Sequence, residues 1–296
     1  MPKILITGKH GQVGFELQRS LSTLGEIVAV DVADCDLSNP EAIRALVREV
    51  QPDIIVHPAA YTAVDKAESE TDLAQTINAT APGVLAEEAA RLGALIVHYS
   101  TDYVFDGTKD GVYTEDDAPN PQSVYGKSKL AGEVAVAAAN PKHVILRTSW
   151  VFGAHGANFL KTMLRLAKER DALKIVADQF GAPTSAALLA DVTAQIVAQY
   201  LRSADKAAFP FGLYHLVSQG ETSWHGYAHC VVEAARRHGW QLNVREIAPI
   251  PTSAYPLPAP RPANSRLSTA KLQQTFGLTL PTWQVQVEQV LTLLKP

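Results

Sequence analysis

The sequence predicts an α/β fold, a doubly wound parallel sheet joined to a smaller mixed α/β domain. Apolar runs rich in Val, Ile and Leu alternate with amphipathic helical segments through the first half of the chain. A glycine triplet separates the first run from the first helix, and the second half is less regular and rich in proline near its end. Nearly continuous apolar runs are typical of strands buried on both faces of a parallel sheet, and their alternation with helices indicates double winding.

Five strands are expected in the first half of the chain. They are residues 3–7 (KILIT), 26–31 (EIVAVD), 53–60 (DIIVHPAA), 94–100 (ALIVHYS) and 143–149 (HVILRTS). Two later runs, residues 173–178 (LKIVAD) and 212–218 (GLYHLVS), predict further strands of the same sheet.

Helices are expected between these strands, and two of them carry clear end signals. In residues 39–52, Asn39 is a plausible N-cap and Pro40 takes the first helical position. Residues 71–93 predict one long helix that ends at Gly93, a C-cap glycine. Four further helices are expected at residues 157–170, 185–201, 223–239 and 280–294.

Residues 248–267 (APIPTSAYPLPAPRPANSRL) are dense in proline. Proline lacks the N–H that a strand ladder or a helix requires, so this segment is expected to be an extended loop. We interpret it as a loop that wraps over a site, because the amphipathic helix that follows must pack on something.

The composition narrows the class of protein. The net charge of −4, with no long basic run, makes nucleic acid an unexpected partner. Cys35 and Cys230 lie far apart without metal-like spacing, which indicates a reducing compartment. The N-terminal apolar run is too short for a signal peptide, and no stretch reaches membrane-spanning length. We therefore expect a cytoplasmic enzyme that does not contact a membrane.

A dinucleotide site is predicted at the start of the chain. Gly8, Gly11 and Gly14, in ITGKHGQVGFEL, stand at the exit of the first strand and the start of the first helix. Glycine lets the backbone turn sharply and approach a pyrophosphate, and the helix N-terminus supplies N–H donors. The order of strand, glycines and helix indicates a Rossmann domain.

The domain boundaries follow from this assignment. Residues 1–150, together with about 173–219, are expected to form the dinucleotide-binding Rossmann domain. Residues 151–172 and about 220–296 are expected to form the substrate-binding domain.

Asp31 closes the second predicted strand, twenty residues after Gly11. A carboxylate in this position accepts hydrogen bonds from the adenosine ribose and repels a 2′-phosphate, which favours NADH over NADPH. No arginine follows Asp31 to offset that repulsion, although Lys9 and His10 in the glycine loop can do so in part.

The candidate catalytic groups lie after the strand at 94–100. Thr101 follows this strand, at a carboxyl end where open α/β sheets bind their ligands. In SVYGKSK, Tyr125 and Lys129 are four residues apart and share a helix face, whereas Lys127 points elsewhere. This spacing often arises by chance, so its weight comes from the dinucleotide fold around it.

These groups suit carbonyl reduction, in which carbon receives a hydride and oxygen a proton. Tyr125 can donate that proton, and a cationic Lys129 is expected to lower the pKa of the phenol from about 10 toward the working range. Thr101 can hydrogen-bond the carbonyl oxygen as charge develops on it. The cofactor supplies the hydride.

Eight motifs, which run through the whole chain in order, resemble the dTDP-4-dehydrorhamnose reductases, a family of extended short-chain dehydrogenases. The motifs are GKHGQVGFELQ, HPAAYTAVDKAE, STDYVFDG, VYGKSKLAGE, RTSWVFG, DQFGAPTSA, GLYHLVSQGETSWHGYA and RPANSRL. The resemblance implies reduction of the 4-keto group of dTDP-4-dehydro-β-L-rhamnose to dTDP-L-rhamnose, the last step of dTDP-rhamnose synthesis. It also implies that either NADPH or NADH can serve.

The resemblance assigns roles by motif. Thr101, Tyr125 and Lys129 match the catalytic trio. With the glycines, the residues that resemble the cofactor cradle are Lys9, His10, Gln12, Val13, Asp31, Asp36, Leu37, Ala59, Ala60 and Thr62, together with Tyr125 and Lys129. The substrate candidates are Thr101, Asp102, Tyr103, Trp150, Asn158, Gln179 and Arg266. Trp224 is interpreted as core packing.

The chain departs from the family pattern at a metal site. Some members of the family are dimers bridged by Mg²⁺ through carboxylates, and Glu16 on the first helix matches one such ligand. In the segment SAALLAD, Ala187 stands where a second acidic residue is expected. A Mg²⁺ bridge is therefore doubtful, and both a monomer and a homodimer stay open.

Two alternative functions remain. A related epimerase or dehydratase would share the glycines and the Tyr–Lys pair, but a dehydratase is expected to carry an acidic pair after Thr101. Here Asp102 is followed by Tyr103, which supplies half of that pair. A non-catalytic, cofactor-binding regulatory subunit would not need Thr101, Tyr125 and Lys129 together.

Overall fold

The computed structural model describes residues 1–294. Its centre is a six-stranded parallel sheet with the strand order β10-β5-β4-β3-β1-β2. These strands are β1 (Lys3–Thr7), β2 (Glu26–Val30), β3 (Ile54–His57), β4 (Leu95–Thr101), β5 (His143–Thr148) and β10 (Gly212–His215). The chain turns from β2 back past β1 to β3, and this reversal is the point where open parallel sheets bind ligands at the strand carboxyl ends.

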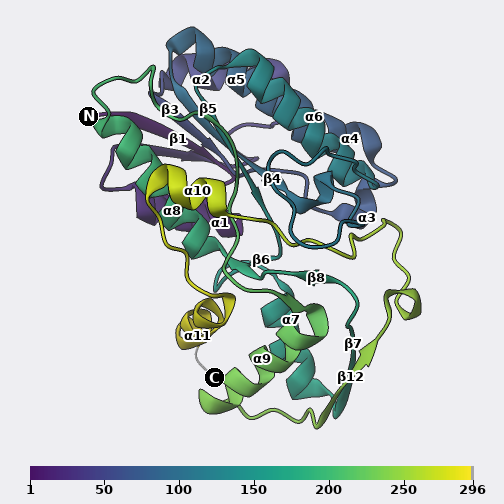
Figure 1. Cartoon of the computed structure of the whole chain (residues 1–296). Helices are drawn as coiled ribbons and strands as arrows, with labels where there is room; N and C mark the ends of the chain where they lie inside the picture. Colours follow the sequence, from purple (N-terminus) through teal and green to yellow (C-terminus); the bar gives the residue numbers. More distant parts are fainter. Residues whose placement is uncertain (295–296) are drawn as a thin grey trace.

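Helices cover both faces of the sheet (Figure 1). On one face pack α2 (Pro40–Val50), α5 (Ala81–Leu92) and α6 (Val124–Ala139). On the other face pack α1 (Gln12–Leu21), α8 (Ala186–Arg202) and α10 (Ala270–Phe276). Burial on both faces explains the continuous apolar runs in the strands, and it confirms the predicted doubly wound fold.

A second hydrophobic cluster lies below the carboxyl ends of the strands (Figure 1). It is built by α7 (Phe159–Glu169), α9 (Trp224–Arg237) and α11 (Trp283–Leu293), with the parallel pair β7 (Ala172–Val176) and β12 (Glu246–Ile250). Short pairs connect it to the sheet: β6 (Val151–Phe152) with β9 (Thr184–Ser185), and β8 (Phe180–Gly181) with β11 (Thr222–Ser223).

Two sequence-based assignments are wrong in this region. The run at 173–178 was expected in the main sheet, but β7 pairs with β12, where Lys174 stands opposite Ala248. Alternate residues of β7 are exposed, as in a strand buried on one face, and hydropathy does not specify a strand's partner. The proline-rich segment also begins as a strand rather than a loop. Pro249 is tolerated in this strand because both strands of a two-stranded sheet are edge strands.

The predicted helix at 71–93 is interrupted. It divides into α4 (Thr71–Gln75), a π turn η1 (Thr76–Thr80) and α5, and Gly93 ends it in the left-handed conformation, at φ 70°. Pro82 has no N–H for the carbonyl of Asn78, which favours the irregular turn. The side chain of Asn78 bonds the backbone of Tyr61 in both directions and donates to Ser128 Oγ on α6. The π turn therefore ties the chain after β3 to α6.

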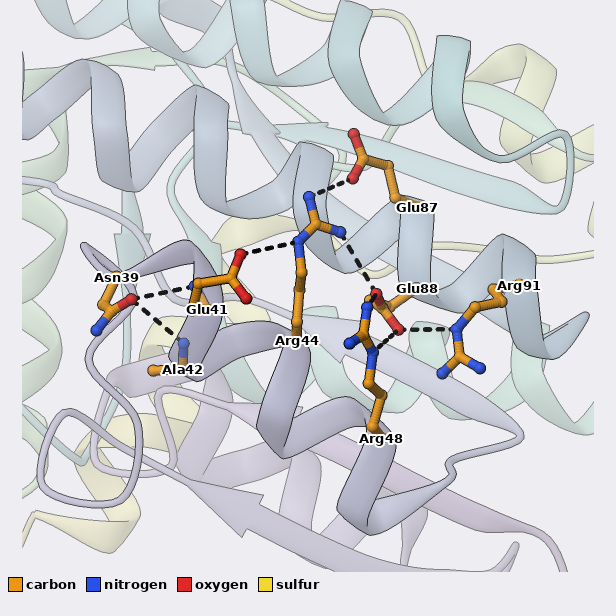
Figure 2. A network of polar contacts seen from close by, with 8 residues as sticks. All are labelled: Asn39, Glu41, Ala42, Arg44, Arg48, Glu87, Glu88 and Arg91. Carbon is orange, nitrogen blue, oxygen red and sulfur yellow. Dashed lines mark hydrogen bonds and ion pairs between the residues drawn. The ribbon is translucent and has the colours of Figure 1, made fainter.

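A charged network fixes α2 on α5 (Figure 2). The buried carboxylate of Glu88 accepts hydrogen bonds from Arg48, at 2.7 and 3.1 Å, and from Arg91, at 3.0 Å. These bonds, led by Arg48, lower the pKa of Glu88 to about 2. Asn39 caps α2 through Glu41 N and Ala42 N, as predicted.

The remaining short helices are α3 (Val64–Ala67), η2 (Asp102–Val104) and η3 (Thr252–Ala254). Within residues 1–294, no helix has both the length and the apolar character needed to span a membrane.

Candidate active site

Thr101 ends β4 and begins η2, at the carboxyl edge of the sheet. Its hydroxyl donates to Asp102 Oδ1 at 3.1 Å and accepts from Tyr103 N at 3.2 Å. Asp102 is buried, and burial raises the pKa of its carboxyl to about 6. The turn therefore holds a hydroxyl and a desolvated carboxyl side by side.

Tyr125 lies in the first turn of α6, close to this edge. Ser123 caps the helix by accepting from Gly126 N at 3.1 Å. A Cβ on Gly126 would lie 2.2 Å from Tyr103 O, so glycine lets α6 pack directly on η2. The rings of Tyr125 and Tyr103 meet edge to face, with centroids 5.5 Å apart.

Lys129 is buried one turn further along α6, whereas Lys127 is exposed, as predicted. Its Nζ donates to Tyr99 O at 2.7 Å and lies 3.4 Å from His98 Nε2. Burial lowers the pKa of Lys129 to about 8, against the opposing effect of Glu133. The ammonium is thus held by uncharged acceptors.

The expected lowering of the Tyr125 pKa is wrong for this state of the molecule. Burial raises the pKa of the phenol to about 12, the Asp102 carboxylate adds to the rise, and the Thr101 hydroxyl opposes it. The hydrogen bonds of the Lys129 ammonium go to β4 rather than to the phenol. Desolvation therefore dominates the titration of Tyr125.

The glycine loop has the form that a pyrophosphate requires. Gly8 takes φ 65°, and a Cβ on Gly14 would lie 2.0 Å from Gly8 O. The first turn of α1 begins after Gly11 with no side-chain cap and no acidic residue. Its N–H groups and dipole fit an anion, so a dinucleotide fits the residues present.

A cavity of about 160 Å³ lies beside this loop. Its lining includes six residues predicted for the cofactor, namely Gly8, Asp31, Asp36, Leu37, Ala59 and Ala60. Asp31 Oδ2 accepts from His10 N at 2.9 Å, and Lys9 Nζ pairs with Asp34 at 2.6 Å. Sequence reasoning missed Asp34, whose only signal was a third carboxylate in the stretch DVADCD.

The other predicted cofactor residues lie outside this cavity. Gln12 Oε1 accepts from Asn158 Nδ2 at 3.0 Å, so Gln12 faces the second cluster. Val13 packs against the core beneath the sheet. Thr62 lies in the segment before α3, outside the lining.

A larger cavity of about 750 Å³ lies between the sheet edge and the second cluster. Tyr103, Trp150 and Gln179, predicted for the substrate, line it. Trp224 lines it too: its ring stacks on Trp150 at 3.7 Å, and its Nε1 donates to Gln179 Oε1 at 3.1 Å. The interpretation of Trp224 as core packing is therefore incomplete, since this ring is shared between the second cluster and the cavity.

The other substrate candidates, Thr101, Asp102, Asn158 and Arg266, do not line this cavity. Asn158 caps α7 by accepting from Lys161 N at 3.1 Å. Arg266 donates to Asn264 Oδ1 at 2.8 Å and pairs loosely with Glu221. Both side chains are held by neighbouring protein groups in this structure.

The proline-rich loop covers the large cavity, as predicted. Residues 255–257 and 259–262 line it. Arg261 Nη2 pairs with Asp65 Oδ2 at 2.8 Å, and Ala259 N donates to Asp65 Oδ1 at 3.2 Å. These contacts fasten the loop to α3. Sequence reasoning missed Arg261, because its position depends on a partner far away in the chain.

Glu16, the candidate metal ligand, lies 3.5 Å from Arg19 Nε on α1. Within residues 1–294, no three or more His, Cys, Asp or Glu side chains gather as a metal site.

The chain is similar to a known family of proteins along nearly its whole length. The family model described as "RmlD substrate binding domain" matches residues 2–295. The chain is 54% identical to the dTDP-4-dehydrorhamnose reductase of Salmonella typhimurium, over 98% of this chain and 97% of that protein.

Two solved structures of this kind are also similar. One is a dTDP-4-dehydrorhamnose reductase of Clostridium acetobutylicum, with a TM-score of 0.91 and 40% identity, covering 99% of each chain. The other is a dTDP-4-dehydrorhamnose reductase of Bacillus anthracis in complex with NADP, with a TM-score of 0.90 and 36% identity, covering 98% of this chain and 99% of that one.

Proposed function

The chain belongs to the RmlD substrate binding domain family, and we propose that it reduces the 4-keto group of dTDP-4-dehydro-β-L-rhamnose, yielding dTDP-L-rhamnose. NADPH or NADH is the reductant, in keeping with the relative whose structure contains NADP. This reaction is the last step of dTDP-rhamnose synthesis.

The observation that carries the proposal is the contact between Tyr103 and Tyr125. Tyr103 lines the large cavity, and its ring meets the ring of Tyr125 at 5.5 Å. A sugar in the cavity would therefore reach the end of β4, where Thr101 and Tyr125 lie. In this proposal, a proton donor and a hydrogen-bonding hydroxyl stand at the inner end of a substrate-sized space.

Each member of the trio has a distinct role in the proposal. The bound nicotinamide supplies the hydride. Tyr125 donates its phenolic proton to the carbonyl oxygen. The Thr101 hydroxyl, after turning from Asp102 Oδ1, hydrogen-bonds that oxygen as negative charge develops. Lys129 stabilises the phenolate that remains, because its ammonium lies one helical turn away in a buried site.

The proposed cofactor cradle is the glycine loop with the small cavity. The uncapped N-terminus of α1 would hold the pyrophosphate. Asp31 and Asp36 would accept from the adenosine ribose, and Leu37 would pack on the adenine. Lys9, His10, Gln12, Val13 and Thr62 stay proposed contributors by their motif.

The proposed sugar-nucleotide site is the large cavity. The Trp150–Trp224 stack offers a flat apolar wall to the sugar or the thymine, and Gln179 supplies an amide. Arg261 would meet the diphosphate. Asp102, Asn158 and Arg266 stay candidates that would have to exchange their present partners.

We also propose the division into two domains, with one adjustment. Residues 1–150 form the dinucleotide unit and residues 151–172 begin the substrate unit. Because β7 pairs with β12, the return to the dinucleotide unit is placed near residue 184 rather than at 173. Residues 220–294 then complete the substrate unit, except for α10, which packs on the main sheet.

The cellular compartment and the oligomeric state of the chain are likewise proposals. The two cysteines are unpaired, which supports a reducing, cytoplasmic compartment. A monomer and a homodimer are both compatible with the contacts described. Glu16 stays the candidate ligand should Mg²⁺ bridge two copies.

A direct assay tests the proposal. The protein is mixed with the 4-keto sugar nucleotide and a reduced cofactor, and the absorbance of the reduced nicotinamide is followed with product analysis. One cofactor oxidised per sugar reduced is the expected result. A changed sugar without net cofactor oxidation would indicate an epimerase or dehydratase. Cofactor binding without any turnover would indicate a regulatory subunit.

A further inference from the structure

A pair of buried histidines lies beside Lys129, and the proposed function gives it no role. His98 on β4 and His57 on β3 are paired in register, and both are fully buried. Their rings stack with centroids 5.3 Å apart and planes 19° apart. His98 Nε2 lies 3.4 Å from Lys129 Nζ, and His57 Nδ1 lies 2.7 Å from Thr7 Oγ1.

The contact with Lys129 fixes the state of His98. An ammonium group can only donate, so His98 Nε2 must accept, and the ring proton must lie on Nδ1. Burial and the nearby Lys129 charge lower the pKa of His98 well below its usual range and that of His57 to about 3. Both rings are therefore neutral at the pH where the enzyme works.

The pair is poorly explained as core packing. Among the described residues, His98 Nδ1 and His57 Nε2 have no hydrogen-bond partner, although both atoms are buried. Leaving buried polar atoms unpaired is destabilising, and an apolar residue would fill the same space without that cost. The histidine pair does, however, provide a hydrogen-bond acceptor, His98 Nε2, for the Lys129 ammonium.

The other groups that face Lys129 do not supply this contact. Glu133, on the same helix, has both carboxylate oxygens bonded to Arg147 on β5, at 2.8 and 2.7 Å. The charge of Asp102 raises the pKa values of Tyr125 and Tyr103. Tyr99 O is a backbone acceptor, so His98 provides the only side-chain acceptor bonded to Nζ within residues 1–294.

We propose that His98 is a positioning residue for Lys129. Its Nε2 and Tyr99 O hold the ammonium at a fixed place one helical turn from Tyr125, and His57, anchored by Thr7, keeps the imidazole in its plane. Because both acceptors are neutral, the ammonium is held without an ion pair. It can therefore still release its proton as the pH rises. The functional consequence rests on the reductase activity proposed above, but the contact itself does not.

Two substitutions of similar polarity distinguish positioning from packing. His98→Gln can place its amide oxygen near the site of Nε2, whereas His98→Asn is too short to reach Nζ. We expect His98→Asn to lower kcat about tenfold with a smaller change in cofactor KM, and to move the basic limb of the kcat–pH profile to lower pH. His98→Gln should recover most of both. The fold-change is an order-of-magnitude expectation for a misplaced catalytic group.

A matched control comes from His215 on β10. It is fully buried, its pKa is lowered to about 3, and neither ring nitrogen has a partner among the described residues. His215→Asn should lower stability without moving the pH limb. The same shift in this variant, or an unshifted wild-type-like profile in His98→Asn, would overturn the proposal.

A measurement without substrate separates this inference from the function. The pKa of Lys129 is followed by NMR on lysine labelled at Cε, with the signal assigned from Lys129→Arg. We expect a lower pKa in His98→Asn than in wild type and a near-wild-type value in His98→Gln, because a lost acceptor destabilises the ammonium. Equal values in all three would refute the positioning role. Failure of the sugar assay alone would refute the proposed function and leave this result standing.

Discussion

The indole of Trp150 lies against the indole of Trp224, with ring centroids 3.7 Å apart and planes 15° apart. Trp150 follows β5, and Trp224 begins α9, so the stack joins the sheet edge to the second cluster. Trp150 holds this place with φ 49°, a conformation that bulky residues rarely adopt. The strained backbone indicates that the direction of this ring matters to the cavity.

Trp224→Leu should therefore weaken substrate binding. Without its partner, Trp150 loses the surface that holds it flat against the ligand, and we expect the KM for the sugar nucleotide to rise about tenfold, or about 1.4 kcal/mol. The KM for the cofactor should not change. Trp240→Leu is the matched control, because Trp240 packs against the same cluster but does not line the cavity. Equal effects in both variants would assign the loss to packing.

Tyr125→Phe should retain cofactor binding and lose turnover. Phenylalanine keeps the ring that contacts Tyr103 but removes the proton donor, which typically reduces kcat by about 100-fold or more. Fluorescence titration with the reduced cofactor and steady-state kinetics measure the two effects. A mutant with wild-type kcat would remove Tyr125 from the chemistry.

The two lysines of α6 offer a paired test. Lys129→Met removes the buried ammonium at nearly constant volume, and we expect a loss of about 100-fold in kcat. Lys127→Met changes an exposed side chain on the same helix and should stay within about twofold of wild type. Kinetics of both variants at one pH suffice, and similar losses in the two would contradict the assignment.

The carboxylates around the small cavity predict no strong preference for NADPH. Asp31 lies where a 2′-phosphate would be repelled, and the Lys9 ammonium is already paired with Asp34. Asp31→Asn should raise the NADPH-to-NADH ratio of kcat/KM about tenfold. Glu26→Gln, exposed at the other end of β2, should leave the ratio unchanged. A wild-type bias of about a hundredfold toward NADPH would refute this reading.

Asp102 predicts a pH-dependent effect on stability. Burial raises the pKa of its carboxyl to about 6, above the value near 4 of an unfolded chain, so folding disfavours its ionised form. Asp102→Asn cannot ionise. It should be more stable than wild type by about 3 kcal/mol above pH 6, with no advantage below about pH 4.

Thermal unfolding of this variant and the wild type across that pH range measures the difference. A stability gain that does not change with pH would point to a cause other than ionisation.

Much of the main sheet could be predicted from sequence, because strands buried on both faces carry their signal in consecutive residues. The prediction for residues 173–178 was right about the strand and wrong about its partner. Hydropathy identified the strand, but its pairing with β12 joins segments about seventy residues apart. The break at η1 was missed because the apolar pattern runs on through Pro82 and the irregularity comes from one missing N–H.

The candidate site divides in the same way. Thr101, Tyr125, Lys129 and the glycines are recognisable because each lies in a short motif with fixed spacing. Trp224 and Arg261 reach the cavity from a helix and a loop that come from later parts of the chain, so local pattern could not place them. His98 was read as one more residue of a buried strand, and the register with His57 becomes visible only when β3 and β4 are paired.

The amide of Asn78 accepts from and donates to Tyr61, next to the cofactor cradle, and also donates to Ser128 on the helix that carries Tyr125 and Lys129. One side chain of the π turn thus holds together two parts of the site that are about fifty residues apart in the sequence. In a saturation mutagenesis screen this position should tolerate almost no replacement, aspartate included, since a carboxylate cannot donate to either oxygen. Any attempt to graft the catalytic helix onto another scaffold would have to bring the π turn with it.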